Sequence, residues 1–335
     1  MKFIISRTDN LGDVILTLPL AGFLKTHFPQ CHVFFIGKTY TKALIEACSF
    51  VDVFLDRNEL LQNPKMLQEL HPDYIFFVFP DKELAKLAKN SHIPQRIGTS
   101  HRWFHWLYAN KLVNFSRKKS DLHEAQLNFK LLDPLVRFEP TFEQLIPFFG
   151  LKASEKDLES TKNYFTNKFS VILHPKSKGS AREWSLDNFY ELAKKLDSKK
   201  YQIFITGVAA EGEAIRVEKP ELFDLEQVTD LTGKFSLAQL LAFVSQADAL
   251  VAASTGTLHI AASLGKLAIG IYPPIRPMHP QRWRPIGKKA HVLVAQKDCQ
   301  DCRKTQNCAC MRSISPETVF DLLEKEAILL SKNVF

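Results

Sequence analysis

The chain has 335 residues, 45% hydrophobic and 24% charged, which is typical of a globular protein and excludes disordered, collagen-like and coiled-coil chains. Its length predicts two domains of about 150–180 residues each. The longest apolar run, Tyr74 to Phe79, is too short to span a bilayer. Arg7, Asp9 and Asp13 lie where a signal peptide needs an uncharged core. We therefore expect a cytosolic protein.

The charge balance is basic, with 44 Lys and Arg residues against 36 Asp and Glu residues, a net charge of +8. An excess of this size favours acidic partners: a nucleotide, a phosphorylated acceptor, an anionic membrane or a nucleic acid. A solvated basic surface that serves only solubility fits the same count.

In the first half of the chain, short apolar segments alternate with helical patterns. This alternation predicts a parallel sheet covered by helices. The periodicity breaks within Phe138–Ser154, where prolines and Gly150 indicate a domain boundary. The expected strands are Lys2–Ser6, His32–Ile36 and Tyr74–Phe79, and the expected helices are Val14–His27, Thr41–Ala47 and Lys82–Asn90.

The alternation starts again in the second half. The expected strands are Ser170–His174, Tyr201–Thr206, Ala249–Ala253 and Leu267–Tyr272, and the expected helices are Leu186–Leu196, Leu237–Ser245, Leu258–Leu264 and Pro316–Ser331. We predict an α/β protein with two doubly wound, Rossmann-like domains, 1–150 and 151–315, facing a cleft. A C-terminal helix, 316–335, is expected to pack back on the first domain. In such sheets ligands bind beyond the carboxyl ends of the strands, so we expect the functional residues in the loops there.

The first such loop runs from Arg7 to Asp13. It contains a single glycine, Gly12, and so lacks the spacing of a dinucleotide-binding fingerprint. Asp13 then stands at the start of a helix, where an aspartate can simply cap the helix, and spacing alone favours that role. The functional alternative is a general base.

The second loop, His174 to Ser185, leads from a strand into a helix. Gly179 and Ser180 leave the backbone accessible, and Lys178 and Arg182 supply positive charge. These groups suit a diphosphate, although the glycine spacing is not that of a P-loop. A solvated basic loop is an equal alternative.

The third loop, Ser254 to His259, follows the apolar strand expected at Ala249–Ala253. Serine and threonine at the start of a helix offer hydroxyl and N–H groups to a phosphate or sugar. Ordinary N-capping explains the same residues, and His259 fits a packed histidine equally well.

Four of the six cysteines, Cys299, Cys302, Cys308 and Cys310, lie within twelve residues of one another. In a cytosolic protein such a group indicates a metal site before a disulfide. The single residue between Cys308 and Cys310 is unusual for structural zinc, however. We therefore favour a structural or incidental thiol cluster, with zinc or an iron–sulfur cluster as the alternative.

The segment from Arg96 to Lys119 interleaves basic and aromatic residues. Such a stretch binds single-stranded nucleic acid in some proteins, and in others lies on an anionic bilayer and binds a phosphorylated glycolipid. A helix with buried aromatic residues and a solvated basic face is the third possibility.

Together these loops resemble the ADP-heptose:lipopolysaccharide heptosyltransferases of glycosyltransferase family 9, along nearly the whole chain. Each motif is weak alone, but their order and spacing are specific. The motifs that carry the resemblance are Arg7 with Gly12-Asp13 and Leu18-Pro19, Arg96-Ile97-Gly98, His123-Glu124, the His174–Trp184 segment, Leu231-Thr232-Gly233 with Leu237–Leu241, and Thr255–Ala262.

The resemblance implies a GT-B fold and an inverting, metal-independent transfer of a heptose from ADP-heptose to the lipopolysaccharide inner core, either Kdo-lipid A or heptosyl-Kdo. By the same resemblance Asp13 is the base and Arg182 neutralises the departing diphosphate. The implied donor-binding residues are Ser177, Lys178, Gly179, Ser180, Glu211, Ser254, Thr255, Gly256, Thr257 and His259, and the implied acceptor-binding residues are Arg7, Asn10, Arg96, Arg102 and Lys111.

The implied partners are the ADP-sugar co-substrate, the lipopolysaccharide acceptor and the cytoplasmic face of the inner membrane, with no other cofactor and no nucleic acid. The sequence departs from the family at Ser254, where many members have an aspartate that contacts the donor sugar. A transferase or an epimerase acting on another nucleotide sugar is therefore the first alternative. A metal- or nucleic-acid-binding protein is the second.

Overall fold

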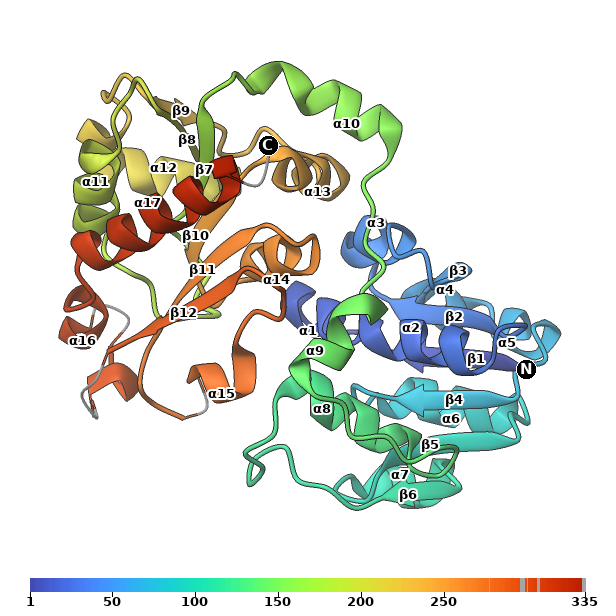
Figure 1. The fold of residues 1–335 in the computed structure, drawn as a ribbon. Coiled ribbons are helices and arrows are strands. Elements are labelled where there is room, and N and C mark those ends of the chain that lie inside the picture. The colour runs from blue at the N-terminus through green and yellow to red at the C-terminus, as the bar shows by residue number, and fades with distance from the viewer. Residues whose placement is uncertain (277, 296–298, 300, 306–307, 333–335) are drawn as a thin grey trace. The chain divides into compact units, whose positions relative to one another are not determined.

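The computed structural model describes residues 1–335 except 277, 296–298, 300, 306–307 and 333–335 (Figure 1). The chain divides into two compact units, Met1–Lys152 and Ala153–Phe335. Each unit contains a six-stranded parallel sheet with helices between the strands, which confirms the predicted α/β class with two doubly wound sheets.

The sheet of the first unit has the order β3-β2-β1-β4-β5-β6. Its strands are β1 (Lys2–Ser6), β2 (His32–Gly37), β3 (Val53–Asp56), β4 (Tyr74–Phe77), β5 (Gln95–Thr99) and β6 (Lys111–Val113). Phe3, Ile4 and Ile5 of β1 are fully buried because helices cover both faces of the sheet. The chain builds from β1 to one edge and then returns to β4 on the other side of β1. The carboxyl ends of β1 and β4 therefore form the topological switch point of this unit.

Helices join these strands. The sequence predicted one helix from Val14 to His27, but the structure has two, because Pro19 lacks an N–H group and its ring would clash with the carbonyl of Ile15, where the first helix ends. The helices of this unit are α1 (Leu11–Ile15), α2 (Leu18–His27), η1 (Thr39–Thr41), α3 (Lys42–Glu46), α4 (Arg57–Gln62), α5 (Lys65–Glu69), α6 (Lys82–Asn90), α7 (Trp103–Tyr108), α8 (Glu124–Phe129), η2 (Lys130–Leu132), α9 (Phe142–Leu145) and η3 (Ile146–Phe148).

The second sheet has the order β12-β11-β10-β7-β8-β9, which repeats the order of the first when counted from its own first strand. Its switch point lies between β7 and β10. The strands are β7 (Phe169–His174), β8 (Tyr201–Ile205), β9 (Val228–Asp230), β10 (Ala249–Ala253), β11 (Leu267–Tyr272) and β12 (Ala290–Val294).

The last helix of the second unit, α17 (Pro316–Lys332), packs against α11 (Leu186–Lys195), and its Val319 and Leu323 are buried in the core of this unit. No helix among the described residues has the length and apolarity needed to cross a membrane. The helices are α10 (Glu155–Thr161), η4 (Lys162–Tyr164), α11 (Leu186–Lys195), α12 (Ala209–Glu218), η5 (Pro220–Leu222), α13 (Leu237–Gln246), α14 (Gly256–Ser263), α15 (Pro280–Trp283), η6 (Asp301–Arg303), α16 (Ala309–Arg312) and α17 (Pro316–Lys332).

Candidate active site

The switch point of the first unit is occupied by a buried arginine surrounded by carboxylates. Arg7 directly follows β1 and is only 4% exposed. Its Nη2 donates to Oδ1 of Asp13, its Nε donates to Oδ1 of Asp9 at 2.6 Å, and its Nη1 donates to Oε1 of Glu124 at 3.0 Å. The guanidinium thus holds Asp13, in the short helix α1, at the carboxyl end of β1.

Three residues of this network were not among the predicted site residues. Arg117 donates to the buried carboxylate of Glu124 and, at 3.0 Å, to Oδ1 of Asn128. The amide of Asn128 in turn donates to Leu16 O at 3.0 Å, in the break between α1 and α2. The His123-Glu124 motif was the one signal for this network, whose members come together across more than a hundred residues of chain.

The electrostatics of Asp13 differ from those of a simple helix cap. Asn10 is the N-cap of α1, and Asp13 accepts from Arg7. Burial raises the pKa of the Asp13 carboxyl to about 6, against the opposing effect of the Arg7 charge, and the nearby charges of Asp9 and Glu124 raise it further. A carboxyl that titrates near neutral pH and lies at a switch point can accept a proton from a bound hydroxyl group.

The other predicted acceptor residues are divided between two places. Asn10 is exposed beside Asp13, whereas Arg96 on β5 and Lys111 on β6 lie two and three strands away from β1. Arg96 donates through Nε to Tyr108 O at 2.8 Å and through Nη1 to Ile93 O, so its guanidinium fixes the backbone at that side of the sheet. Arg102 is exposed at the N-cap of α7.

In the second unit, the loop after β7 forms a tight turn. Lys178 and Gly179 both have positive φ angles, 49° and 78°, and Ser180 N–H donates to Ser177 O at 3.0 Å. Glu183, which sequence reasoning missed, accepts from both Ser177 N–H at 2.8 Å and Ser177 Oγ at 2.9 Å. Lys178, Gly179 and Ser180 are exposed, so the turn presents a cation, a hydroxyl group and accessible backbone.

The loop after β7 is attached to the cysteine-rich segment. Arg182 is partly buried, and its Nε donates to Cys302 O at 2.6 Å. Trp184 is fully buried and donates through Nε1 to Ile314 O at 2.9 Å. Two side chains of the predicted diphosphate loop therefore hold the segment that carries the four thiols.

The remaining predicted donor residues follow the neighbouring strands β8 and β10. Glu211 accepts from Val208 N–H at 2.8 Å in the first turn of α12. Thr255 is the N-cap of α14 and accepts from Leu258 N–H at 3.4 Å. Gly256 and Thr257 are the first residues of α14, and Ser254, which precedes the cap, is partly buried. Because β10, β7 and β8 are adjacent in the sheet, the structure brings the loops that carry the predicted donor residues to one edge of it.

Two buried histidines lie beneath these loops. His174, at the end of β7, contacts Thr206 Oγ1 at 2.9 Å and Thr257 Oγ1 at 3.4 Å, and so connects the ends of three strands. Burial lowers the pKa of His174 and of His259 to about 4, which leaves both rings neutral at pH 7. His259 is 3% exposed on α14 and belongs to the interior of this corner.

Two doubly wound units with candidate groups at the carboxyl ends of their strands define a GT-B protein, an architecture of nucleotide-sugar transferases. The model of glycosyltransferase family 9 (heptosyltransferase) matches residues 85–311, more than half of the chain. The chain therefore belongs to glycosyltransferase family 9 and is a glycosyltransferase.

Individual proteins agree with this assignment. The "Putative glycosyltransferase" of Haemophilus influenzae is 27% identical over 85% of this chain and 86% of its own length. Lipopolysaccharide heptosyltransferase 2 of Escherichia coli is 28% identical over 88% of both chains. The solved structure of E. coli ADP-heptose lps heptosyltransferase II has a TM-score of 0.77 at 20% identity and covers 99% of this chain and 100% of its own.

Proposed function

We propose that this protein transfers a heptose from ADP-heptose to the inner core of lipopolysaccharide, either Kdo-lipid A or heptosyl-Kdo, with inversion at the anomeric carbon. The observation that carries the proposal is the buried Asp13 carboxyl, whose pKa of about 6 suits a general base. Membership of the heptosyltransferase family and the similarity to lipopolysaccharide heptosyltransferase 2 of E. coli support the choice of sugar and acceptor.

In the proposed reaction the acceptor hydroxyl oxygen forms a bond to the anomeric carbon while the bond from that carbon to the diphosphate oxygen breaks. Asp13 takes the hydroxyl proton, and the electron pair of the broken bond leaves with ADP. Proton removal by a positioned base contributes about 10²–10⁴-fold to such a step. The reaction needs no cofactor besides the ADP-sugar, because the base and the diphosphate-binding groups are protein side chains.

We assign the departing diphosphate to the turn from Ser177 to Ser180 and to Arg182. Charge-assisted hydrogen bonds from a guanidinium, together with hydroxyl and backbone donors, stabilise negative charge as it develops on the leaving group. We assign Glu211, in the first turn of α12, to the ribose hydroxyls, and the corner from Ser254 to Thr257, with its hydroxyl and N–H groups, to the sugar or phosphate.

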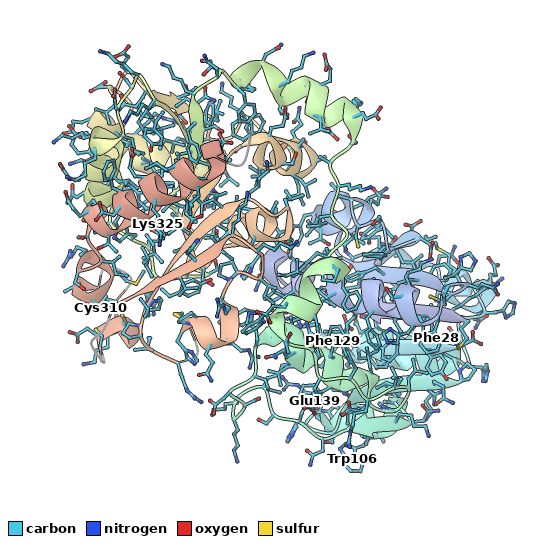
Figure 2. The ribbon with its side chains drawn as sticks, viewed as in Figure 1. Phe28, Trp106, Phe129, Glu139, Cys310 and Lys325 are labelled. Carbon is cyan, nitrogen blue, oxygen red and sulfur yellow. The ribbon has the colours of Figure 1, made fainter. Side chains whose placement is uncertain are left out.

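The acceptor is a lipid, and helix α7 supports docking of the enzyme at the cytoplasmic face of the inner membrane. Trp103, Trp106 and Leu107 are 64%, 66% and 53% exposed, and the indole of Trp106 projects from the surface (Figure 2). Lys82 lies 4.9 Å from the Trp103 ring, and Arg102 and Lys111 flank the helix in sequence. Exposed indoles with nearby cations are typical of surfaces that bind anionic bilayers.

The experiment that tests the proposal is a transfer assay with Kdo-lipid A and heptosyl-Kdo-lipid A as acceptors, with product masses measured. We expect heptose addition from ADP-heptose and thermal stabilisation by ADP over UDP and GDP, because a ligand that binds only the folded state raises its stability. Transfer from a UDP- or GDP-sugar would overturn the donor. A changed sugar nucleotide formed without any acceptor would identify an epimerase instead.

The membrane surface is tested separately by co-sedimentation with vesicles that contain anionic lipid. We expect Trp103→Ala combined with Trp106→Ala to weaken vesicle binding several-fold, while activity on a short, delipidated acceptor is retained. A matched control is Tyr40→Ala, which removes an exposed aromatic side chain elsewhere in the same unit. Equal vesicle binding by all three proteins would exclude α7 as the docking surface.

A further inference from the structure

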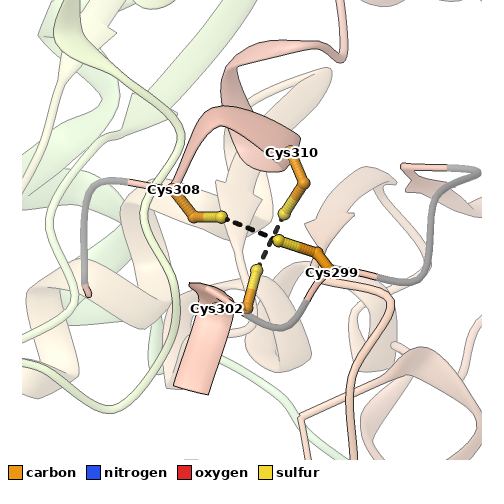
Figure 3. A group of neighbouring side chains, drawn as sticks. All are labelled: Cys299, Cys302, Cys308 and Cys310. Atoms are coloured by element: carbon orange, nitrogen blue, oxygen red, sulfur yellow. Dashed lines mark hydrogen bonds between the residues drawn. The ribbon is translucent and has the colours of Figure 1, made fainter. Parts of the chain in front are cut away.

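The four cysteines of the second unit meet at one point in space (Figure 3). Cys299 and Cys302 come from the segment around η6, and Cys308 and Cys310 from the start of α16. All four sulfur atoms lie within 4.8 Å of one another, and three of the four residues are buried. Cys31 and Cys48, the other two cysteines, are buried in the first unit.

The sulfur atoms are arranged as ligands rather than as disulfides. The separations of 3.1 Å for Cys299–Cys308 and 2.7 Å for Cys302–Cys310 exceed an S–S bond of about 2.05 Å, and all four thiols are free. Four thiolates around one ion with bonds of about 2.3 Å would have sulfur atoms nearly 4 Å apart, within the spread observed. Such a set needs only small side-chain shifts to become tetrahedral.

The surroundings of the cluster also suit thiolate ligands. Cys302, Cys308 and Cys310 belong to the apolar core of the second unit together with Met311. Once deprotonated, thiolates gathered in an apolar core need a counter-charge, which a bound cation supplies.

We propose that Cys299, Cys302, Cys308 and Cys310 bind one zinc or iron ion in a closed, structural tetrathiolate site. Four protein ligands leave no open position, so the ion has no direct part in catalysis. The Cys308-x-Cys310 spacing weighs against zinc when the sequence is considered alone, but spacing is only a proxy for the ligand geometry that the fold supplies. Soft thiolate ligands in tetrahedral array select zinc or iron over magnesium or calcium.

The site would also organise the loop assigned to the diphosphate, a consequence that rests on the proposed function. Arg182 Nε donates to Cys302 O at 2.6 Å, Trp184 Nε1 to Ile314 O at 2.9 Å, and Asn188 Nδ2 to Arg312 O at 3.1 Å. The cysteine-rich segment is thus held at three points against the end of that loop and the start of α11. An ion that fixes this segment fixes the position of Arg182.

The test is elemental analysis of the full-length protein, as purified and after anaerobic reconstitution with zinc or ferrous iron. We expect about one ion per chain, lost in Cys302→Ser and in Cys310→Ser but kept in the control Cys48→Ser. Iron would show visible thiolate charge-transfer absorption, whereas zinc would be colourless. Because the cluster variants can fail to fold, reconstitution of the wild type with cobalt provides a second measurement. We expect the cobalt-loaded protein to show the visible absorption spectrum of cobalt bound tetrahedrally by thiolates.

Three results would each overturn the metal site: absence of metal in both preparations, retention of metal by the cluster variants, or disulfides Cys299–Cys308 and Cys302–Cys310 in protein purified under reducing conditions.

A second experiment tests whether the ion positions the diphosphate loop. We expect removal of the ion by a chelator to raise the Kd for ADP about tenfold, with recovery when the ion is added back. An unchanged Kd would overturn the coupling and leave the metal site standing. Failure of the metal-loaded wild type to bind ADP would count against the proposed function alone.

Discussion

The two units of this protein share a strand order but form their switch points from different interactions. In the first unit, Arg7 binds its near neighbours Asp9 and Asp13 and also Glu124, 117 residues further along the chain, in a buried network of charged side chains. In the second unit, the turn after β7 is held by contacts between near neighbours, such as Ser177 with Glu183. One region buries opposite charges, and the other exposes hydrogen-bond donors.

The same sheet topology can therefore carry a general base in one unit and an anion-binding turn in the other. Burial, together with the like charges of Asp9 and Glu124, shifts the pKa of the Asp13 carboxyl toward neutral pH against the effect of Arg7, and a base requires such a shift. An exposed turn with positive φ angles at Lys178 and Gly179 presents donors to an anion without such a shift. The neutral His174 beneath that turn adds no charge of its own.

The sharpest way to separate the two regions is Asp13→Asn. We expect kcat to fall about 10²–10⁴-fold, because the amide cannot accept the hydroxyl proton, while thermal stabilisation by ADP is unchanged. The matched control is Asp81→Asn, since Asp81 is also buried and paired with an arginine, Arg57, at 2.6 Å. Near-normal turnover in the Asp13 variant would remove the base from the proposed mechanism.

The converse variant is Arg182→Ala, which should damage binding of the diphosphate. Loss of a charge-assisted hydrogen bond of about 1.5–3 kcal/mol predicts that the Kd for ADP rises about 10- to 150-fold, as measured by calorimetry. Lys195→Ala is the control, because it removes a cation of the same unit that pairs with Glu317. If both variants bind ADP equally well, the diphosphate does not contact Arg182.

The pH dependence follows from the raised pKa of Asp13. The base acts when ionised, so kcat/KM should fall about tenfold for each pH unit below about 6 and level off above it.

The contribution of Asp13 to folding stability changes with pH in the opposite direction. The folded protein binds a proton at higher pH than the unfolded chain does, so this group makes folding less favourable as pH rises from about 4 to about 6. Urea unfolding of wild type and Asp13→Asn across this range should show that contribution in the wild type only.

The smallest effect is expected for Glu183→Gln. The amide keeps the shape of the side chain and one acceptor oxygen for Ser177, but loses the charge that strengthens both hydrogen bonds. We predict that KM for the donor rises about fivefold with kcat little changed. Lys176 pairs with two carboxylates, Glu183 at 3.7 Å and Glu218 at 2.8 Å. Glu218→Gln, which removes only the second of them, should leave KM unchanged. Equal effects of both variants would assign the change to Lys176 rather than to the turn.

Much of the fold could be predicted from apolar segments. The strands β1, β10 and β11 and the helix α6 begin and end where the sequence indicated, because each is a continuous apolar or amphipathic run with clear boundaries. The strands β3, β5, β6, β9 and β12 were missed. Gln95–Thr99 and Val228–Asp230 carry polar residues, and their strand conformation depends on hydrogen bonds to the neighbouring strand rather than on their own propensity.

The candidate site likewise has a part that local sequence patterns predict and a part that depends on contacts in the fold. The loops containing Asp13, Arg182 and Thr255 could be found because each follows an apolar strand. The His123-Glu124 motif marked one partner of these residues, but the contacts of Glu124 and Asn128 with Arg7 could not be predicted, since both residues come from another part of the chain. For Arg96, which the resemblance assigns to the acceptor, the structure adds that its guanidinium donates to the backbone carbonyls of Tyr108 and Ile93.

By itself the sequence determined the α/β class, the loops at the strand ends and the resemblance to family 9, because these depend on local patterns and motif order. Only the tertiary structure decided that Asp13 is a buried carboxyl beside Arg7 with a pKa near 6, and that four thiols meet at one point. The physical reason is that burial and charge act through space. A residue's neighbours in the fold set its protonation and its ligands, and the sequence alone shows neither how deeply these groups are buried nor that Glu124 reaches Arg7 across 117 residues.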